Sequence, residues 1–274
     1  MIKAFGFRTV LLTAAAILTF ENTSFAATPV LYDAAADPGL SPDASVNSEG
    51  GATVNAWTTT FSANGGGSTF YQPPSTFLND ATYVEDDAWQ LFDASGNNTG
   101  QIFSKHDFVA SDGSAVGPGQ TISLVWANSS IQNSGGGDVG ISLKDASNTT
   151  IAEFHFMGGG TDYLRNDAAP STTTGKAFEF QDLMKVTWNI GVGGAYTATV
   201  TDPGTGSLEA SWAGTLGSGA TTVSGIEVFD FQGGAGSDVF YDDLTVVPEA
   251  GTWLAAALTL AGCLFISRRH RRIS

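Results

Sequence analysis

Apolar and polar residues alternate along most of the chain from Thr53 onward. Because successive side chains of a strand point to opposite faces, a period of two predicts half-buried β-strands. Clusters of glycine, asparagine, aspartate and serine separate the alternating sets and predict turns. The sets are Ile122, Leu124 and Trp126; Val139, Ile141 and Leu143; Val186, Trp188 and Ile190; Tyr196, Ala198 and Val200; and Leu208, Ala210 and Trp212.

Many short strands at fairly regular spacing predict an all-β fold, an antiparallel β-sandwich of jelly-roll type. The body between residues 27 and 247 has 221 residues, which suits one such domain. No repeat of 20 to 50 residues is found, so a solenoid or propeller is disfavoured. The opening third is less regular, and we expect an edge strand near Val30 to Tyr32 followed by long loops before Ala52.

The N-terminus has the three parts of a secretory signal peptide. Lys3 and Arg8 make it basic, residues 10–20 form an apolar run, and Ser24-Phe25-Ala26 supplies small residues where a signal peptidase reads the chain. The run is too short for a lasting membrane span. Residues 1–26 are therefore predicted to be a signal peptide, cleaved by signal peptidase after Ala26.

The C-terminus combines a polar turn at Pro248, an uncharged apolar run at residues 251–267 and a basic cluster. The 17 residues of the run are near the lower limit for crossing a bilayer core of about 30 Å. Arginines stay on the cytoplasmic side of such a helix and set its orientation. These residues are Arg268, Arg269, Arg271 and Arg272. We therefore predict a single transmembrane helix with the body on the outer side of the membrane.

The order of Pro248-Glu249, a tryptophan-containing apolar run and terminal arginines resembles the PEP-CTERM sorting signal of exopolysaccharide-producing bacteria. Ala250 stands where the usual pattern has a second proline. The resemblance covers about a tenth of the chain, residues 248–274. It implies recognition by an exosortase at Val247, Pro248 and Glu249. A plain C-terminal membrane anchor is the alternative.

This resemblance also implies a location and a role. The chain would reside in the inner membrane of a Gram-negative bacterium before processing, and then at the cell surface or in the extracellular matrix. A structural or adhesive role in biofilm or exopolysaccharide is implied, with extracellular polysaccharide as a partner. Two alternatives stay open, a surface-displayed carbohydrate-binding module and a secreted glycan-acting enzyme.

The closing stretch at residues 239–246 has an aromatic–Asp-Asp–aliphatic pattern. It resembles the final strand of concanavalin-A-like and laminin-G-like jelly-roll sandwiches. Regular alternation would place Asp242 on the buried face with Phe240 and Leu244. A buried carboxylate has to be paired, hydrogen-bonded or metal-bound, because burying it alone costs several kcal/mol.

A structural calcium ion is the metal that this acidic strand suggests. Calcium takes six to eight oxygen ligands from carboxylates and carbonyls. Asp242 or Asp243 would supply some of them, and Asp33 and Asp37 others, if the first and last strands are neighbours.

Charge and cysteine content narrow the classes of partner. The body has five lysine and arginine residues and 25 acidic ones, a net charge of −20. Such a surface repels nucleic acid and anionic lipid headgroups, so the body is not expected to bind either. The single cysteine, Cys263, lies in the apolar tail, which excludes disulfides and thiolate chemistry from the body.

Catalytic signals are weak. The body has two histidines, His106 and His155, about fifty residues apart, which make no zinc signature. No Gly-x-Ser-x-Gly elbow is present. His155 is expected to point outward from a strand, and Glu227 and Asp230 to lie on opposite faces, which does not suit a glycosidase pair. The sequence therefore predicts a protein that is not an enzyme.

Sugar binding would use exposed aromatic side chains. Trp126 and Trp188 alternate with aliphatic residues and are expected in the core. Trp89 and Tyr71 lie in loop-rich sequence and are the predicted ligand-binding aromatic residues.

Overall fold

The computed structural model describes residues 31–33, 52–54, 57–62, 68–71, 88–93, 100–108, 114–131, 136–234 and 238–248. They belong to one compact unit, Thr28–Glu249. The predicted signal peptide (1–26), the transmembrane helix (251–267) and the arginine cluster lie outside the described residues. Within those ranges, no helix is long and apolar enough to cross a membrane.

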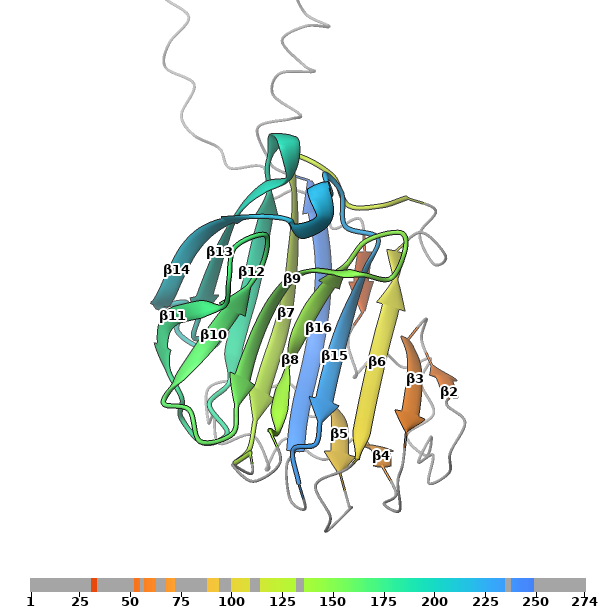
Figure 1. The fold of residues 1–274 in the computed structure, drawn as a ribbon, viewed down its shortest axis with the longest axis vertical. Helices are drawn as coiled ribbons and strands as arrows, with labels where there is room; N and C mark the ends of the chain where they lie inside the picture. The colour runs from red at the N-terminus through yellow and green to blue at the C-terminus, as the bar shows by residue number, and fades with distance from the viewer. Residues whose placement is uncertain are drawn as a thin grey trace, which may run out of the picture. The chain divides into compact units, whose positions relative to one another are not determined.

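Two antiparallel sheets pack face to face (Figure 1). Sheet A contains, in spatial order, β14 (Leu208–Thr215), β13 (Ala195–Thr201), β12 (Met184–Ile190), β7 (Gln120–Asn128), β16 (Asp238–Pro248), β5 (Trp89–Asp93) and β4 (Ser68–Tyr71), with β1 (Leu31–Asp33) on β16. Sheet B contains β11 (Thr172–Ala177), β10 (Asp162–Asn166), β9 (Thr150–Met157), β8 (Asp138–Lys144), β15 (Gly225–Phe231), β6 (Gln101–Asp107), β3 (Trp57–Ser62) and β2 (Ala52–Val54). Two short 3-10 helices, η2 (Val192–Gly194) and η3 (Gly217–Gly219), connect strands. The prediction of an all-β antiparallel sandwich is confirmed.

The last two strands lie inside the sheets. β15 is hydrogen-bonded between β6 and β8, and β16 between β5 and β7. β1 pairs with β16, with Asp33 opposite Leu244. The predicted strand near the start of the body is therefore present, and it lies beside the closing strand, as the calcium hypothesis required.

The core lies between the two sheets and is rich in aromatic rings. Trp126 of sheet A meets Phe154 and Tyr163 of sheet B edge to face, each with ring centroids 5.7 Å apart. Trp57 of β3 packs on Tyr241 of β16 at 4.9 Å. Such pairs contribute about 0.5–1.5 kcal/mol beyond the burial of their area. The aromatic contacts therefore hold the sheets to each other as well as filling the space between them.

The predicted inward sets match the buried positions of β7, β8, β12 and β13. β14 departs from its predicted set, because Leu208 at its start is 63% exposed. Ala210 is buried, and Trp212 is partly buried against the core.

The closing strand differs from its predicted alternation. Val239 and Tyr241 face the main core, and Leu244 and Val246 face it too. Pairing with β7 shifts register between Asp242 and Thr245, and Asp243 has a left-handed φ of 52°. This β-bulge inserts a residue, so the prediction that Asp242 shares a face with Leu244 is wrong.

Asp242 is nevertheless buried, at 2% exposure. It lies opposite Val125, and Phe240 lies opposite Ala127. Phe240, Val125 and Ala127 form part of a second, smaller apolar cluster separate from the main core.

Gly140 of β8 permits a close approach of β9. A Cβ atom at this position would lie 2.4 Å from the Phe154 carbonyl oxygen and 2.6 Å from the His155 Cβ. Contacts of that length with backbone do not occur, so any larger residue would push the two strands apart.

Gly140→Ala should therefore lower the free energy of unfolding by about 1–3 kcal/mol, the range for overpacked sites. Gly117→Ala is the matched control, because its Cβ would have no neighbour closer than 3.8 Å. It should change the stability by less than about 0.5 kcal/mol. Urea unfolding followed by tryptophan fluorescence measures both, and equal effects of the two variants would contradict the close approach of β8 and β9.

Candidate functional site

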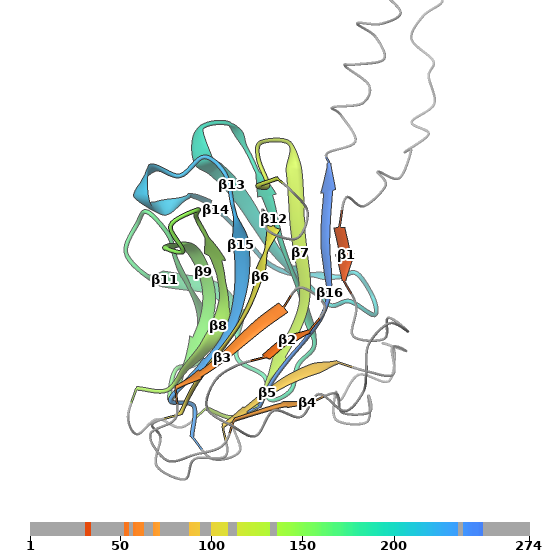
Figure 2. The same cartoon turned by 90° about the vertical axis from the view of Figure 1, so that its right-hand side faces the viewer.

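The outer face of sheet B is the surface on which this sandwich concentrates ordered polar groups. Figure 2 shows that the middle of this sheet bows toward sheet A, which makes the outer face concave, and that no third layer of described strands covers it. We call this surface, over β6, β15, β8 and β9, the concave face. Ser142, Lys144, His155 and Glu227 point outward on it, yet each is less than a tenth exposed. Side chains on this face are therefore held tightly by one another.

Strand register arranges the concave face in rows. One row crosses the sheet as Thr60, Phe103, Phe229, Gly140, His155 and Leu164. The next row is Thr58, Lys105, Glu227, Ser142, Glu153 and Asn166. Within the first row, Phe103 and Phe229 thus lie on one side of Gly140 and His155 on the other. Gly140, which has no side chain, lies between them.

The His155 ring is fixed by carboxylates from two strands. Its Nδ1 lies 2.9 Å from Asp138 Oδ1 and 3.1 Å from Oδ2. Glu153, on the same strand as His155, accepts a hydrogen bond of 2.7 Å from Ser142 Oγ through Oε2. Its Oε1 lies 3.9 Å from His155 Nε2. The ring is thus flanked by a carboxylate at each nitrogen.

Burial and charge act on this ring in opposite directions. Burial lowers the pKa of His155, but the hydrogen bond and charge of Asp138 and the charge of Glu153 raise it, and the pKa is above its ordinary value. Nε2 is buried and has no hydrogen-bond partner among the described residues. Because a carboxylate only accepts, Nδ1 carries a proton, and in the neutral ring Nε2 has a free lone pair.

The lysines on the concave face are paired. Lys144 Nζ lies 2.7 Å from Glu227 Oε1 and donates to Thr150 Oγ1 at 2.8 Å. Lys105 Nζ lies 3.4 Å from Asp107 Oδ2. The positive charges of this face are therefore neutralised by its own carboxylates.

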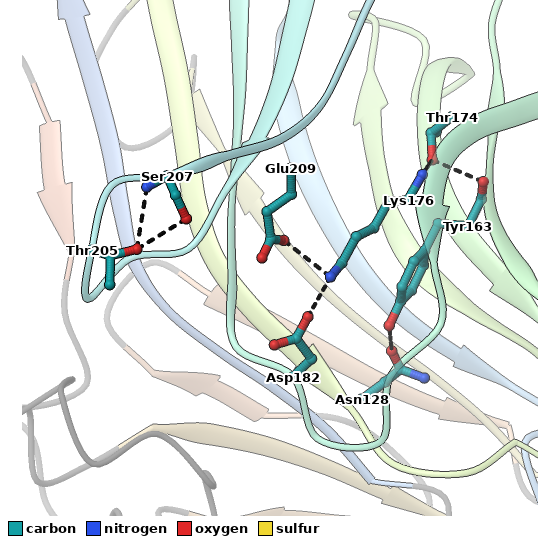
Figure 3. Close-up of polar contacts among 8 residues, drawn as sticks. All are labelled: Asn128, Tyr163, Thr174, Lys176, Asp182, Thr205, Ser207 and Glu209. Atoms are coloured by element: carbon teal, nitrogen blue, oxygen red, sulfur yellow. Dashed lines mark hydrogen bonds and ion pairs between the residues drawn. The ribbon is translucent and has the colours of Figure 1, made fainter.

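A second polar cluster joins β11, at the edge of sheet B, to β14, at the edge of sheet A (Figure 3). Lys176 Nζ lies between Asp182 Oδ2, at 2.6 Å, and Glu209 Oε2, at 3.1 Å. The Tyr163 hydroxyl donates to Asn128 Oδ1 at 2.7 Å, and Thr174 Oγ1 to the Tyr163 carbonyl at 2.9 Å. We call Lys176, Asp182 and Glu209 the edge cluster.

Bonding partners separate the two clusters by role. The Lys176 side chain is 7% exposed and has two carboxylate partners, so the edge cluster is an ion-paired network that links the sheet edges. A buried group without a partner, by contrast, requires an explanation such as a catalytic role or a bound ion. His155 Nε2 on the concave face is such a group. The concave face is therefore the candidate functional site, and the edge cluster is structural.

The structure does not support the predicted role of Trp89 as an exposed aromatic residue. Trp89 begins β5, is 2% exposed and belongs to the main core. The loop-rich sequence around Trp89 led to a wrong prediction of exposure, because the short strand β5 within it is buried. Tyr71 ends β4, and its side chain lies outside the described residues.

The predicted calcium and sorting residues are placed in part. Asp242 and Asp243 form the bulge of β16, and a calcium ion there stays a prediction, since Asp37 lies outside the described residues. Val247 and Pro248 are the last residues of β16, opposite Thr121 and Gln120. Glu249 is also outside the described ranges.

Sequence reasoning missed the cluster around His155. It placed Glu153 and His155 correctly on the outward face, opposite the buried Phe154. Asp138 lies 17 residues away and reaches the ring only through the register of β8 with β9. The Asp145–Thr149 turn, in which Asp145 Oδ1 accepts from the amides of Ser147 and Thr149, predicts that β8 pairs with β9, but the pairing shifts register between Leu143 and Lys144.

Neither a protein-family model nor a curated protein sequence matches this chain. Among solved structures, the chain is similar to the carbohydrate esterase vb_24B_21 from the Shiga toxin-encoding bacteriophage phi24B, with a TM-score of 0.50 and 14% identity over 81% of this chain and 99% of the esterase. An endo-β-1,4-glucuronan lyase from the fungus Trichoderma reesei has a TM-score of 0.46 and 12% identity, over 81% of this chain and 96% of the lyase. A structure from a study of endo-acting O-glycanases of the human gut microbiota has the same score and identity, over 81% of this chain and 99% of its own.

These likenesses concern the fold. The likeness to the esterase nevertheless contradicts the prediction that the protein is not an enzyme, because a protein of similar fold is a carbohydrate esterase. The prediction that the protein is not an enzyme depended on the lack of three catalytic patterns: a serine elbow, a histidine pair and two nearby carboxylates. A histidine held by a carboxylate from a neighbouring strand matches none of those patterns.

Lys176→Met tests the edge cluster. The substitution removes the charge that holds Asp182 and Glu209 and should lower the free energy of unfolding by about 1–3 kcal/mol, less than for a fully buried pair because both carboxylates are partly exposed. Lys185→Met, at a half-buried position of β12, is the matched control and should stay within about 0.5 kcal/mol. Denaturant unfolding of both variants measures the difference.

The difference in free energy of unfolding between wild type and Lys176→Met should decrease at high pH. Burial lowers the pKa of Lys176, but the hydrogen bonds that it donates to Asp182 and Glu209 raise the pKa above the ordinary value. A raised pKa of a cation stabilises the fold below the unfolded value of about 10.4, and the gain is lost as pH rises through the folded value. The stability gap between wild type and Lys176→Met should thus be constant from pH 6 to 9 and narrow above about pH 10.5. A stability difference that grows above about pH 10.5 would contradict the ion pairs of Lys176 with Asp182 and Glu209.

Proposed function

We propose that this protein is an exported, carbohydrate-related β-sandwich of jelly-roll type that binds a glycan on its concave face. The single observation that carries the proposal is the ordered row on that face, from the Phe103–Phe229 pair to the buried His155. The shared fold with a carbohydrate esterase supports the same class of ligand.

The two ends of the row have complementary chemistry for a sugar. The half-buried Phe103 side chain, next to Phe229 at 6% exposure, offers apolar surface to the face of a pyranose ring. Ser142 and Glu153, one row away, offer hydroxyl and carboxylate oxygens to sugar hydroxyl groups. Phe229 lies on β15 and Ser142 on the neighbouring β8, so a sugar unit would lie over these two strands.

The negative charge of the body favours some classes of glycan over others. The body has a net charge of −20, and Glu227 and Asp107 already neutralise the lysines of the concave face. An acidic polysaccharide would meet repulsion here, because like charges raise the cost of association. The proposed ligand is therefore a neutral or amino-substituted glycan.

Hydrolysis of a glycan ester at the same face is a second candidate function. The observation that favours it is the lone pair of the buried His155 Nε2 beside Glu153, with the ring oriented by Asp138. Such a nitrogen can take a proton from an attacking water. Ser142 donates its hydroxyl to Glu153 and is not set up as a nucleophile by this contact.

We further propose that the tail sorts the body to the cell surface through an exosortase. What supports this is the order of the tail's three parts and the end of β16 at Pro248, immediately before Glu249. A cut near Pro248-Glu249 would leave the whole sandwich on one side of the cleaved bond. We also propose that Asp242 and Asp243, at the bulge of β16, bind a structural calcium ion.

Phe103→Ala should weaken glycan binding about tenfold, which corresponds to about 1.4 kcal/mol, while the fold is retained because the side chain is on the outer surface. Val192→Ala, at an 86% exposed residue of η2, is the control and should leave affinity unchanged. A glycan array followed by titration calorimetry with the best neutral hit measures both. Absence of any saturable binding to neutral or amino glycans would contradict the proposal.

The mature C-terminus tests sorting separately. Mass spectrometry of the surface fraction should find a chain that ends between Val247 and Ala250 or is joined there to another molecule. Replacing Pro248 and Glu249 with alanine should leave the chain uncleaved in the inner membrane. An intact Ser274 at the surface of wild-type cells would contradict exosortase processing.

A further inference from the structure

The concave face contains one group of side chains with the composition of a metal site. Asp138, Glu153 and His155 each place one donor atom within 4.8 Å of the others. They come from two paired strands: Glu153 lies opposite Ser142, and His155 lies opposite Gly140. Their positions are therefore set by the sheet and not by a loop.

The His155 ring has one nitrogen in use and one without a partner. Nδ1 bonds the Asp138 carboxylate at 2.9 Å, while Nε2 is buried and has no hydrogen bond to any described residue. The residue is 5% exposed, so bulk water does not solvate the ring freely. Nε2 lies 3.9 Å from Glu153 Oε1, a distance too long for a hydrogen bond. The nitrogen without a partner is thus close to a carboxylate of the same group.

This arrangement is the one that proteins use around zinc. A histidine that binds zinc through one nitrogen commonly donates its other N–H to a carboxylate, which fixes the tautomer and the ring. Asp138 occupies that position for His155. Ser142 holds the other oxygen of Glu153 in a similar way, at 2.7 Å, and leaves Oε1 turned toward the ring.

We propose that His155 Nε2 and Glu153 Oε1 bind a zinc ion on the concave face, with Asp138 and Ser142 positioning these two ligands. Zinc takes bonds of about 2.0–2.2 Å, so tetrahedral ligands lie about 3.3–3.6 Å apart. The observed 3.9 Å needs a shift of about half an ångström, within reach of a glutamate side-chain rotation. A nitrogen donor disfavours calcium and magnesium, which take oxygen ligands.

Two protein ligands leave open positions for water or for oxygen atoms of a ligand. The site therefore holds an exchangeable ion at the surface, unlike a closed structural zinc site. An ion on Nε2 occupies the lone pair, so a zinc-loaded ring does not act as a base. The proposal does not depend on glycan binding, and its test uses no sugar.

The experiment measures zinc binding by the full chain, purified in mild detergent without a histidine tag. Equilibrium dialysis with elemental analysis should give one zinc per chain, and excess calcium should not compete. His155→Gln should lower the affinity at least fiftyfold, and Glu153→Gln and Asp138→Asn about 10- to 100-fold each. Asp107→Asn, a carboxylate on β6 of the same sheet, is the matched control and should stay within twofold of wild type.

Cobalt gives a second readout. Co²⁺ in place of zinc should produce visible absorption bands of a protein-bound site, and these should vanish in His155→Gln. Circular dichroism establishes that each variant is folded; if His155→Gln does not fold, Glu153→Gln and Asp138→Asn decide. Wild-type protein without a saturable site, or equal zinc affinity in the cluster variants and Asp107→Asn, would overturn the proposal. A chain that does not bind zinc could still bind glycans, so the two experiments test the two proposals separately.

Discussion

The structure depends on the insertion of the last two strands into the middle of both sheets. β15 bonds to β6 and β8, and β16 to β5 and β7, so neither sheet is continuous without residues 225–248. Such pairings are far apart in sequence and form late, because closing a long loop precedes the gain from its contacts. The sandwich can therefore be completed only after nearly the whole body is available to fold.

The concave face inherits its geometry from the same constraint. β15 carries Phe229 and Glu227 into the centre of the face, where they meet Phe103 on one side and β8 on the other. Gly140 then lets β9 approach β8 closely and brings His155 beside Asp138. A change in either pairing would move the aromatic pair or the ring, although no residue of the site itself had changed.

Sequence alone predicted the periodic parts of this molecule and missed the interruptions. Inward residues such as Leu124 and Trp188 follow from alternation, because each strand is regular where they occur. Asp243 adopts a left-handed φ at the bulge, which the alternation of apolar and polar residues does not reveal. Trp89 was misplaced because strand β5 is short and lies in loop-rich sequence. The His155 cluster was missed because contacts between strands depend on register, which periodicity leaves free.

The two buried polar clusters show how partners decide between a structural and a functional interpretation. Lys176 and His155 are both nearly inaccessible, and both have their pKa raised by neighbouring carboxylates against the effect of burial. Lys176 has a carboxylate on each side at bonding distance, and the cluster joins two sheet edges that would otherwise separate. His155 has one bonded carboxylate and a second at 3.9 Å, which leaves a nitrogen that protein groups alone do not satisfy. If that nitrogen served stability only, a hydrogen-bonded or apolar residue in its place would be the better choice, since an unmet buried polar atom costs about 1–3 kcal/mol. A buried nitrogen without a protein partner is expected where a ligand, an ion or a reacting water arrives.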